Sequence, residues 1–291
     1  MTICIGTICR GNDQHPLVIG ASDRLLVAGG MKAEPFQTKV AQLSAKVAAM
    51  ISGTVPTCTT IIQDALLQVS RLDQNSILVR DVASICANAF ASCRRAEAES
   101  LLLTPLSLRV SNLTHPDETM SPYVLDKCIN EMRKYELEAE LMVVGIDTLG
   151  AHIYVIENPG YPHCQNDIGY AVIGSGGWHA KAHLMSMNYT NSWPLQDCLF
   201  VTHAAKRRAE SDIYVGTATD IFFIAPQLTP SYARLPDNVL SELNKNYDQA
   251  KVKKDKIELE AFQLLKTYLE KTFPPAPSPS PTPTSSPEKT T

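Results

Sequence analysis

The sequence predicts an α+β protein in which two packed β-sheets carry helices on their outer faces, a four-layer αββα sandwich. Strand-like and helix-like segments come in blocks, in the order strands, two helices, strands, two helices and a strand. The strand-like segments are apolar along their whole length, which is typical of strands covered on both faces. The 291 residues, 44% of them apolar, are enough for a core of this size.

The first block of strands lies before Gly53. Residues 2–9 and 17–21 are uncharged and rich in β-branched side chains, which favour strands. Residues 10–16 between them have the Gly, Asn, Asp and Pro composition of a turn, so we expect a hairpin. Residues 46–51 form a further apolar run, which predicts another strand that ends near Gly53.

Helical periodicity replaces the strand pattern after Gly53. Apolar residues within 61–72 recur at spacings of three and four, with Thr57 or Thr59 as the expected N-cap. A second helix is expected to place the apolar side chains within residues 82–93 on one face. The sequence therefore predicts two helices lying on a sheet.

The span from residue 106 to residue 140 is harder to place. Residues 106–122 are polar and contain prolines, and an amphipathic helix is expected from about Pro122 to Glu140. We interpret this span as an insertion or as an extension of the second-helix region. Its surface could form an oligomer contact, but we favour simple cover for the fold.

The second half of the chain repeats the alternation of strands and helices. Residues 148–150 separate two apolar runs, which predicts a second hairpin. Ser192 is the expected N-cap of the last helix in this half. The expected elements are strands at 141–147, 151–156 and 170–173, helices at 178–187 and 194–211, and a strand at 219–224.

Three parts are expected along the chain. Residues 1–235 contain all the expected strands and would form one domain. Residues 236–272 are helical in pattern and rich in charge, which predicts a C-terminal helical extension with a solvated face. Residues 273–291 are dominated by Pro, Ser and Thr and cannot bury apolar area, so a disordered tail is expected.

The composition excludes several classes of function. A net charge of −4 with both signs interspersed gives no basic field, so no nucleic-acid partner is expected. No leader and no apolar run long enough to span a bilayer is present, so we expect a cytoplasmic protein with no membrane partner. The eight cysteines lack a C-x-x-C pair and are expected to be reduced. His179 and His183 lack a third ligand nearby in the sequence, so neither a metal nor a cofactor is expected.

The N-terminus is the most informative stretch for function, because it enters a strand directly where termini are usually polar and frayed. Thr2 is small enough for methionine aminopeptidase to remove Met1, which would leave a threonine with a free α-amine. Such a residue carries a hydroxyl nucleophile and its own base, because an α-amine titrates near ~7.7–8.0. Thr2 is therefore the candidate nucleophile.

Three residues follow Thr2 in a recognisable order. Asp23 comes directly after the second apolar run, Lys39 lies in the next segment, and Gly53 closes the strand after it. This set resembles the N-terminal-nucleophile (Ntn) hydrolases of the proteasome β-subunit and bacterial proteasome-like type. From Asp23 to Lys39 to Gly53 the spacing matches that family without a gap.

The resemblance continues in the second half of the chain. Ser175 lies in a Gly-Ser-Gly motif where a strand turns into a helix, and Asp212 follows at the family spacing. The resemblance covers roughly Thr2 to Ile224, and it implies the four-layer sandwich of the Ntn-hydrolase type.

The position of the nucleophile has alternatives. The interval from Thr2 to Asp23 is longer than in the family, and counting back without a gap reaches Thr7. Thr7 follows Gly6, as it would at a cleaved propeptide junction. A chain that began at Thr7 would reach the polar turn after three residues, too short for the first strand, so Thr2 is preferred. Cys4 could act only after unusual processing and is expected to face the core.

The resemblance implies a role for each matched residue. Thr2 Oγ1 attacks a carbonyl carbon and its α-amine accepts the proton, while Lys39, held charged by Asp23, lowers the hydroxyl pKa. The backbone N–H of Gly53 would donate to the oxyanion. The residues expected to orient the amine are Ser175 and Asp212.

Two positions depart from the family. Val215 stands where the family has a serine, so a hydroxyl near the amine is missing. Val27 stands where the family tends to have threonine, at a point where the backbone makes the substrate contact. A small or medium apolar side chain is expected to fit beside Thr2. The resemblance places the substrate-binding residues at Leu26, Val27, Gln37, Ala41, Ile51 and Val55.

The expected function is that of an N-terminal-threonine amide hydrolase. The preferred form is a proteasome-like threonine peptidase that cleaves peptides or unfolded proteins. The resemblance implies a closed homo-oligomeric ring, which would sequester the nucleophile, and an unfolding ATPase as a further partner. Two alternatives are open. One is a small-molecule amidase on the same fold, and the other is a catalytically weak structural ring subunit, which Val215 favours.

Overall fold

The part of the chain that the structure, a computed structural model, describes comprises residues 2–11, 13–28, 31–34, 39–74, 76–115 and 121–273, without the side chains of Val27 and Ala28. It is of the predicted α+β class, with two five-stranded antiparallel sheets. The chain divides into two compact units, Met1–Leu240 and Ser241–Thr291, and the named strands lie in the first. The expected tail lies outside the described residues, except for Phe273.

The first sheet is built around the N-terminal hairpin, which confirms the prediction. β1 (Cys4–Arg10) pairs antiparallel with β2 (Pro16–Asp23), and Cys4 lies opposite Ser22. The strand order is β10-β1-β2-β11-β12. The remaining strands are β10 (Tyr170–Ile173), β11 (Thr219–Ile224) and β12 (Tyr232–Arg234), the last of which was not predicted.

The second sheet has the order β5-β6-β7-β8-β9 and contains the second predicted hairpin, β7–β8. A separate two-stranded sheet joins β3 to β4. Neither this small sheet nor β9 was predicted, because strands of three or four residues carry little periodicity. The strands are β3 (Leu26–Ala28), β4 (Met31–Ala33), β5 (Val40–Gln42), β6 (Val47–Gly53), β7 (Ala139–Asp147), β8 (Gly150–Glu157) and β9 (Tyr161–Cys164).

The two five-stranded sheets share a buried core. Met50 and Met142 of the second sheet pack in one cluster with Phe222 of the first. The sheets approach closely at Gly6, where a Cβ would lie 2.7 Å from Met142 Sδ. One face of each sheet is therefore buried against the other sheet.

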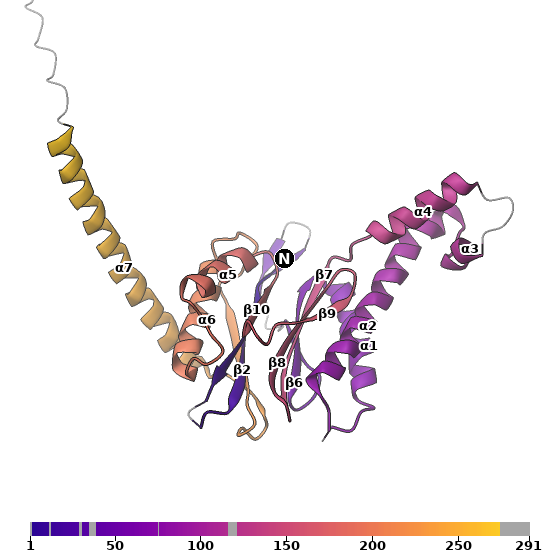
Figure 1. Cartoon of the computed structure of the whole chain (residues 1–291), viewed down its shortest axis with the longest axis horizontal. Coiled ribbons are helices and arrows are strands. Elements are labelled where there is room, and N and C mark those ends of the chain that lie inside the picture. The colour runs from indigo at the N-terminus through magenta and orange to yellow at the C-terminus, as the bar shows by residue number, and fades with distance from the viewer. Residues whose placement is uncertain are drawn as a thin grey trace, which may run out of the picture. The chain divides into compact units, whose positions relative to one another are not determined.

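Helices cover the other face of each sheet (Figure 1). α1 (Val55–Val69) and α2 (Val79–Ala98) share an apolar core with the second sheet. α5 (Gly177–Ser186) and α6 (Leu195–Ala209) pack on the first sheet. These four helices confirm the predicted ones, and together with the sheet–sheet core they explain why the strands are apolar on both faces.

The start of α1 differs from the prediction. The helix begins earlier than expected, with Thr54 at the N-cap and Pro56 in its first turn, so Thr57 and Thr59 both lie inside it. Proline suits the first turn because the N–H that it lacks would have no helical partner there. The Thr57 hydroxyl donates instead to Glu97 of α2, at 2.8 Å.

The start of α6 also differs from the prediction. Pro194 occupies the N-cap, and Ser192 forms a hydrogen bond with the Thr190 hydroxyl at 2.8 Å. The extended backbone that proline favours ends the preceding loop here, so no side-chain cap is involved.

The described part of the span between α2 and β7 contains a π-helical turn, a 3-10 turn and two α-helices. They are η1 (Glu99–Leu103), η2 (Thr104–Leu106), α3 (Val110–Thr114) and α4 (Pro122–Lys134). The prediction that a helix continues to Glu140 is wrong, because that residue belongs to β7. The side chain of Asn158 accepts the Leu137 N–H at 2.9 Å and donates to the Leu137 carbonyl at 3.0 Å. These two bonds hold the chain extended as it enters the sheet.

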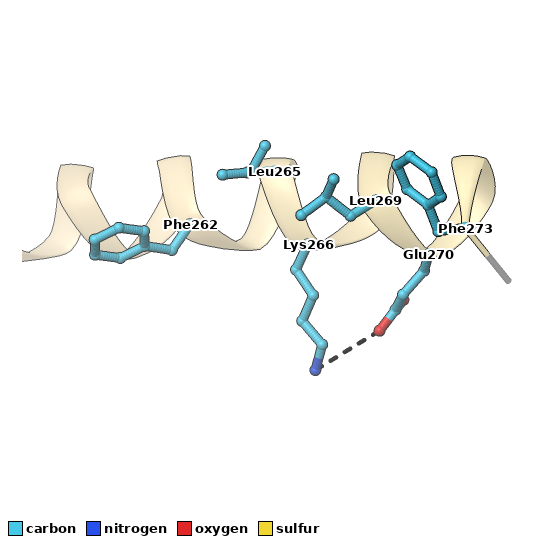
Figure 2. A pocket seen from close by; sticks show the side chains of 6 residues that line it. All are labelled: Phe262, Leu265, Lys266, Leu269, Glu270 and Phe273. Carbon is cyan, nitrogen blue, oxygen red and sulfur yellow. Dashed lines mark ion pairs between the residues drawn. The ribbon is translucent and has the colours of Figure 1, made fainter. Parts of the chain in front are cut away.

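α7 (Asp237–Thr272) forms the helix predicted for the C-terminal extension. Lys266 and Glu270 form an ion pair at 3.8 Å along its last turns (Figure 2). Across the described ranges, every helix is too short or too polar to cross a bilayer. Six side chains line a surface pocket on α7: Phe262, Leu265, Lys266, Leu269, Glu270 and Phe273.

Candidate active site

The residues predicted to act together with Thr2 meet at one edge of the two sheets. Thr2 precedes β1, and Asp23 ends the neighbouring strand β2. Lys39 precedes β5 of the other sheet, and its carbonyl accepts the N–H of Ile51 on β6. In an antiparallel pair the start of one strand lies beside the end of the next. The sheets therefore bring these residues to one place from opposite sides of the core.

Thr2, Asp23 and Lys39 form one hydrogen-bonded cluster. The Thr2 hydroxyl donates to Asp23 Oδ1 and accepts from Lys39 Nζ. The Lys39 ammonium also donates to Asp23 Oδ1, at 2.8 Å. Only 2% of Thr2, none of Asp23 and 7% of Lys39 is exposed. An ammonium in contact with a hydroxyl lowers its pKa, because positive charge stabilises the alkoxide.

Backbone donors also hold Asp23 in place. Oδ1 accepts the Ile3 N–H at 2.9 Å. Oδ2 accepts the N–H groups of Leu25, at 3.1 Å, and Gly216, at 2.9 Å. Burial alone would raise the pKa of Asp23, but the charge and the hydrogen bond of Lys39 help to hold it below its usual value. Asp23 is therefore an anion that faces the Lys39 ammonium.

Gly53, the predicted oxyanion donor, ends β6 two residues beyond Ile51. Its φ of +129° lies in the region that favours glycine, and a Cβ would lie 2.1 Å from the Glu138 carbonyl oxygen. Gly53 is exposed, whereas the preceding Ser52 is buried. Its backbone is thus open to solvent at the same edge of the sheet as Lys39.

The Gly-Ser-Gly turn after β10 lies against Thr2. Gly174 has a φ of +96°, and a Cβ there would lie 2.2 Å from the Thr2 carbonyl oxygen. The Gly176 N–H points at the same oxygen, at 3.5 Å. Ser175 between them is exposed, and within the described residues its hydroxyl makes no hydrogen bond to Thr2. The backbone of the turn therefore reaches Thr2, and the role of the Ser175 hydroxyl toward the α-amine stays a prediction.

Asp212 and Val215 lie in the loop after α6. Asp212 Oδ1 accepts the Tyr214 N–H at 2.9 Å, and the Asp212 carbonyl accepts the Val215 N–H at 3.0 Å. The Asp212 carboxylate thus shapes its own loop. Val215 is buried against the turn, because a Cβ at Gly176 would lie 2.7 Å from Val215 Cγ2.

The residues predicted to bind substrate are only partly described. Leu26, Ala41 and Ile51 are half-buried, and Val55 is exposed at the start of α1. Ala41 and Ile51 pack against the core beneath α1 and α2. Two of the predicted groups lie outside the described part of the structure: Gln37 and the side chain of Val27.

The two alternative nucleophiles are poorly placed. Thr7 is fully buried inside β1, and its hydroxyl forms a hydrogen bond with Thr202 of α6 at 2.9 Å. Cys4 is also fully buried, and this burial raises the pKa of its thiol far above the usual value. Thr2 is buried as well, but its hydroxyl accepts from Lys39 Nζ, and this contact favours Thr2.

Three further residues support the site but were not identified from the sequence: Glu140, Lys206 and Gly216. Glu140 Oε2 accepts the Gly174 N–H at 2.6 Å and so anchors the turn that meets Thr2. The sequence feature that could have identified Glu140 is the position of its carboxylate directly before the apolar run that starts at Leu141. Lys206 and Gly216 carried no comparable signal, because their contacts form only in the folded chain.

Two further observations bear on the function: the placement of possible metal ligands and the comparisons with known proteins. In the described ranges, no group of three or more His, Cys, Asp or Glu side chains is placed to hold a metal ion. Neither protein-family models nor curated proteins give a match to this chain.

Proposed function

We propose that this chain is an N-terminal-threonine amide hydrolase with the four-layer αββα architecture of the Ntn hydrolases. The observation that carries the proposal is the Lys39 ammonium, which donates to Thr2 Oγ1 and to Asp23 Oδ1 at once. A purely structural ion pair would need only the carboxylate. Here the lysine also contacts the hydroxyl that removal of Met1 would place beside a free amine.

The proposed reaction follows from the charges around this hydroxyl. Thr2 Oγ1 attacks the amide carbonyl carbon, and the α-amine accepts the hydroxyl proton, directly or through a water molecule. Lys39 stabilises the developing alkoxide, and Asp23 keeps Lys39 charged. An N–H donor to the oxyanion, which we assign to Gly53, is worth about 2.7–4 kcal/mol. The intermediate expels the amine, which takes up the proton, and water then hydrolyses the ester on Thr2.

Peptides are the substrates we favour among amides. The support is the resemblance to proteasome-like peptidases, together with the exposed glycine backbone at Gly53, which an extended chain could approach closely. A closed homo-oligomeric ring, an unfolding ATPase partner and a cytoplasmic location belong to the same proposal, and the resemblance is their support.

The test of this proposal is the mass of the mature chain combined with a substrate panel. We expect intact-mass spectrometry to show loss of Met1 and an unmodified amine on Thr2. We then expect the purified protein to cleave fluorogenic peptides with small or medium apolar side chains faster than small-molecule amides. A retained Met1 or an acetylated terminus would remove the proposed base and contradict the mechanism.

The same panel separates the two alternative functions. Turnover confined to small amides would identify a small-molecule amidase. No turnover by a chain with a free Thr2 amine would instead favour a structural subunit, for which the missing hydroxyl at Val215 is the specific observation.

The family has a serine where this chain has Val215, and substituting Val215 with serine tests whether the missing hydroxyl limits activity. We expect Val215→Ser to raise kcat or to leave it unchanged, because the side chain packs against the turn whose Gly176 N–H points at Thr2. A net hydrogen bond is worth roughly 0.5–1.5 kcal/mol, so the gain should be about tenfold at most. Loss of activity in a folded Val215→Ser chain would show that the amine is held in another way, and it would remove Ser175 and Asp212 from the site.

A further inference from the structure

Lys206 is a lysine of α6 whose side chain is completely buried. Its Nζ donates to three acceptors, which are Glu210 Oε1 at 2.7 Å and the carbonyls of Gly216 at 2.9 Å and Thr217 at 2.8 Å. A neutral amine has only two N–H donors, so contact with three acceptors calls for the ammonium form. Burial lowers the pKa of Lys206, while the charges of Glu210 and Asp23 oppose this shift.

The backbone of Gly216 connects this buried cation to the candidate active site. Its carbonyl accepts from Lys206, and its N–H donates to Asp23 Oδ2 at 2.9 Å. Gly216 is also tightly enclosed, because a Cβ there would lie 2.2 Å from Glu34 Oε1 and 2.8 Å from Leu25 Cβ. The backbone at Gly216 therefore has little freedom to turn away from the carboxylate.

We infer that Lys206 is a positioning residue, which fixes the backbone at Gly216 and through it holds Asp23 in place for Lys39 and Thr2. Asp23 then has an ammonium on each side: Lys39 contacts Oδ1 directly, and Lys206 acts on Oδ2 through the backbone of one residue, Gly216. The N–H and the carbonyl of Gly216 belong to successive peptide units, so Lys206 acts on this N–H by fixing the backbone around it and not by polarising it. The inference rests on the proposed function only for its effect on reactivity.

The hydrogen bonds of Lys206 do more than neutralise its buried charge. Glu210 alone would satisfy the charge of Lys206, since the two lie four residues apart on α6 and pair at 2.7 Å. The two remaining N–H donors are directed at consecutive carbonyls of the loop that touches Asp23. Buried lysines are costly unless paired, so a methionine of similar length would fit this site better if Lys206 only filled space.

Two measurements on Lys206→Met test the inference. The first is amide hydrogen exchange over residues 212–219, which we expect to speed up in the variant, because the loop loses its anchor. The second is acylation of Thr2 by a β-lactone, followed by intact-mass spectrometry. We expect the maximal rate of acylation to fall about 10- to 100-fold, as for loss of a charge-assisted hydrogen bond, with the half-saturating lactone concentration unchanged.

Matched variants separate positioning from stability. Thr202→Val removes another buried polar group of α6, one turn earlier, and should leave both readouts within about twofold of the wild type. If Lys206→Met does not fold, Lys206→Gln takes its place, with the same expected directions.

The outcomes are distinct for the inference and for the proposed function. Unchanged exchange at residues 212–219 in folded Lys206→Met would overturn the inference, whatever the activity. Faster exchange with an unchanged rate of Thr2 acylation would also overturn it, since Asp23 would then not depend on Lys206. Failure of the wild-type chain to be acylated at Thr2, with faster exchange in the variant, would contradict the proposed function and leave the contact between Lys206 and the Asp23 loop supported.

Discussion

Thr2→Ala is expected to abolish amide hydrolysis while the chain remains folded. Alanine is small enough for Met1 still to be removed, so the variant would keep the free amine and lose only the hydroxyl. Removing a nucleophile of this kind lowers kcat by about four orders of magnitude or more. Turnover of the best peptide in the panel, measured beside the intact mass, checks this expectation.

Thr2→Ser is the matched control for the alanine variant. It keeps the hydroxyl that bonds to Asp23 and Lys39, and we expect activity within about tenfold of the wild type. Thr2→Ala also leaves one oxygen of a buried carboxylate with fewer donors, which should lower the free energy of unfolding by about 1–3 kcal/mol. Equal activity of the alanine and wild-type chains would show that the nucleophile lies elsewhere.

Lys39→Ala is expected to abolish turnover as well, with a larger effect on acid stability than Thr2→Ala, because Lys39 lowers the pKa of Asp23 by its charge and by a hydrogen bond, and Thr2 by a hydrogen bond only. The ammonium is the neighbour that stabilises the Thr2 alkoxide, and a planar guanidinium cannot replace it in this buried site, so Lys39→Arg should fail too. Both variants should retain the fold, because Asp23 keeps backbone donors from Ile3, Leu25 and Gly216. Kinetics and circular dichroism on both chains check these expectations.

The acid-stability effect follows from the pKa of Asp23. In the folded wild type this pKa lies below its usual value, so Asp23 stabilises the fold above the unfolded-state pKa and loses that contribution as the pH falls through the folded-state value. Without the Lys39 charge the folded-state pKa rises, so the acid-unfolding midpoint of Lys39→Ala should move to higher pH. Near-normal activity in either lysine variant would show that Lys39 is only structural.

The sequence was informative about the groups that meet at Thr2 only partly through its strand pattern. Asp23 closes β2, an apolar strand that the sequence predicts. Lys39 precedes β5, a strand of three residues that was not predicted, and only the spacing of the resemblance identified this lysine. The sequence could not reveal that Gly216, 193 residues after Asp23, donates to the same carboxylate. That contact depends on how the loop after α6 packs, and no local periodicity encodes such packing.

The errors in the fold arose where local preference and tertiary pairing disagree. Residues up to Glu140 continue a helical pattern, but β7 pairs with β6 from Ala139 onward, so Ala139 and Glu140 belong to a strand. The Thr57 hydroxyl looked like a helix cap and is used instead for a bond to Glu97. In both cases a partner distant in sequence decides the local structure.

The division of the site between two sheets has a consequence for a chain that is still folding. Thr2 and Asp23 belong to the first sheet and Lys39 to the second, so the hydroxyl meets its cation only after the sheets have docked. A half-assembled chain would hold a threonine beside a carboxylate, an arrangement that raises the hydroxyl pKa and leaves it unreactive. The Thr2 hydroxyl would thus become reactive only at the end of folding. A newly made chain would not cleave neighbouring proteins before its own two sheets have packed together.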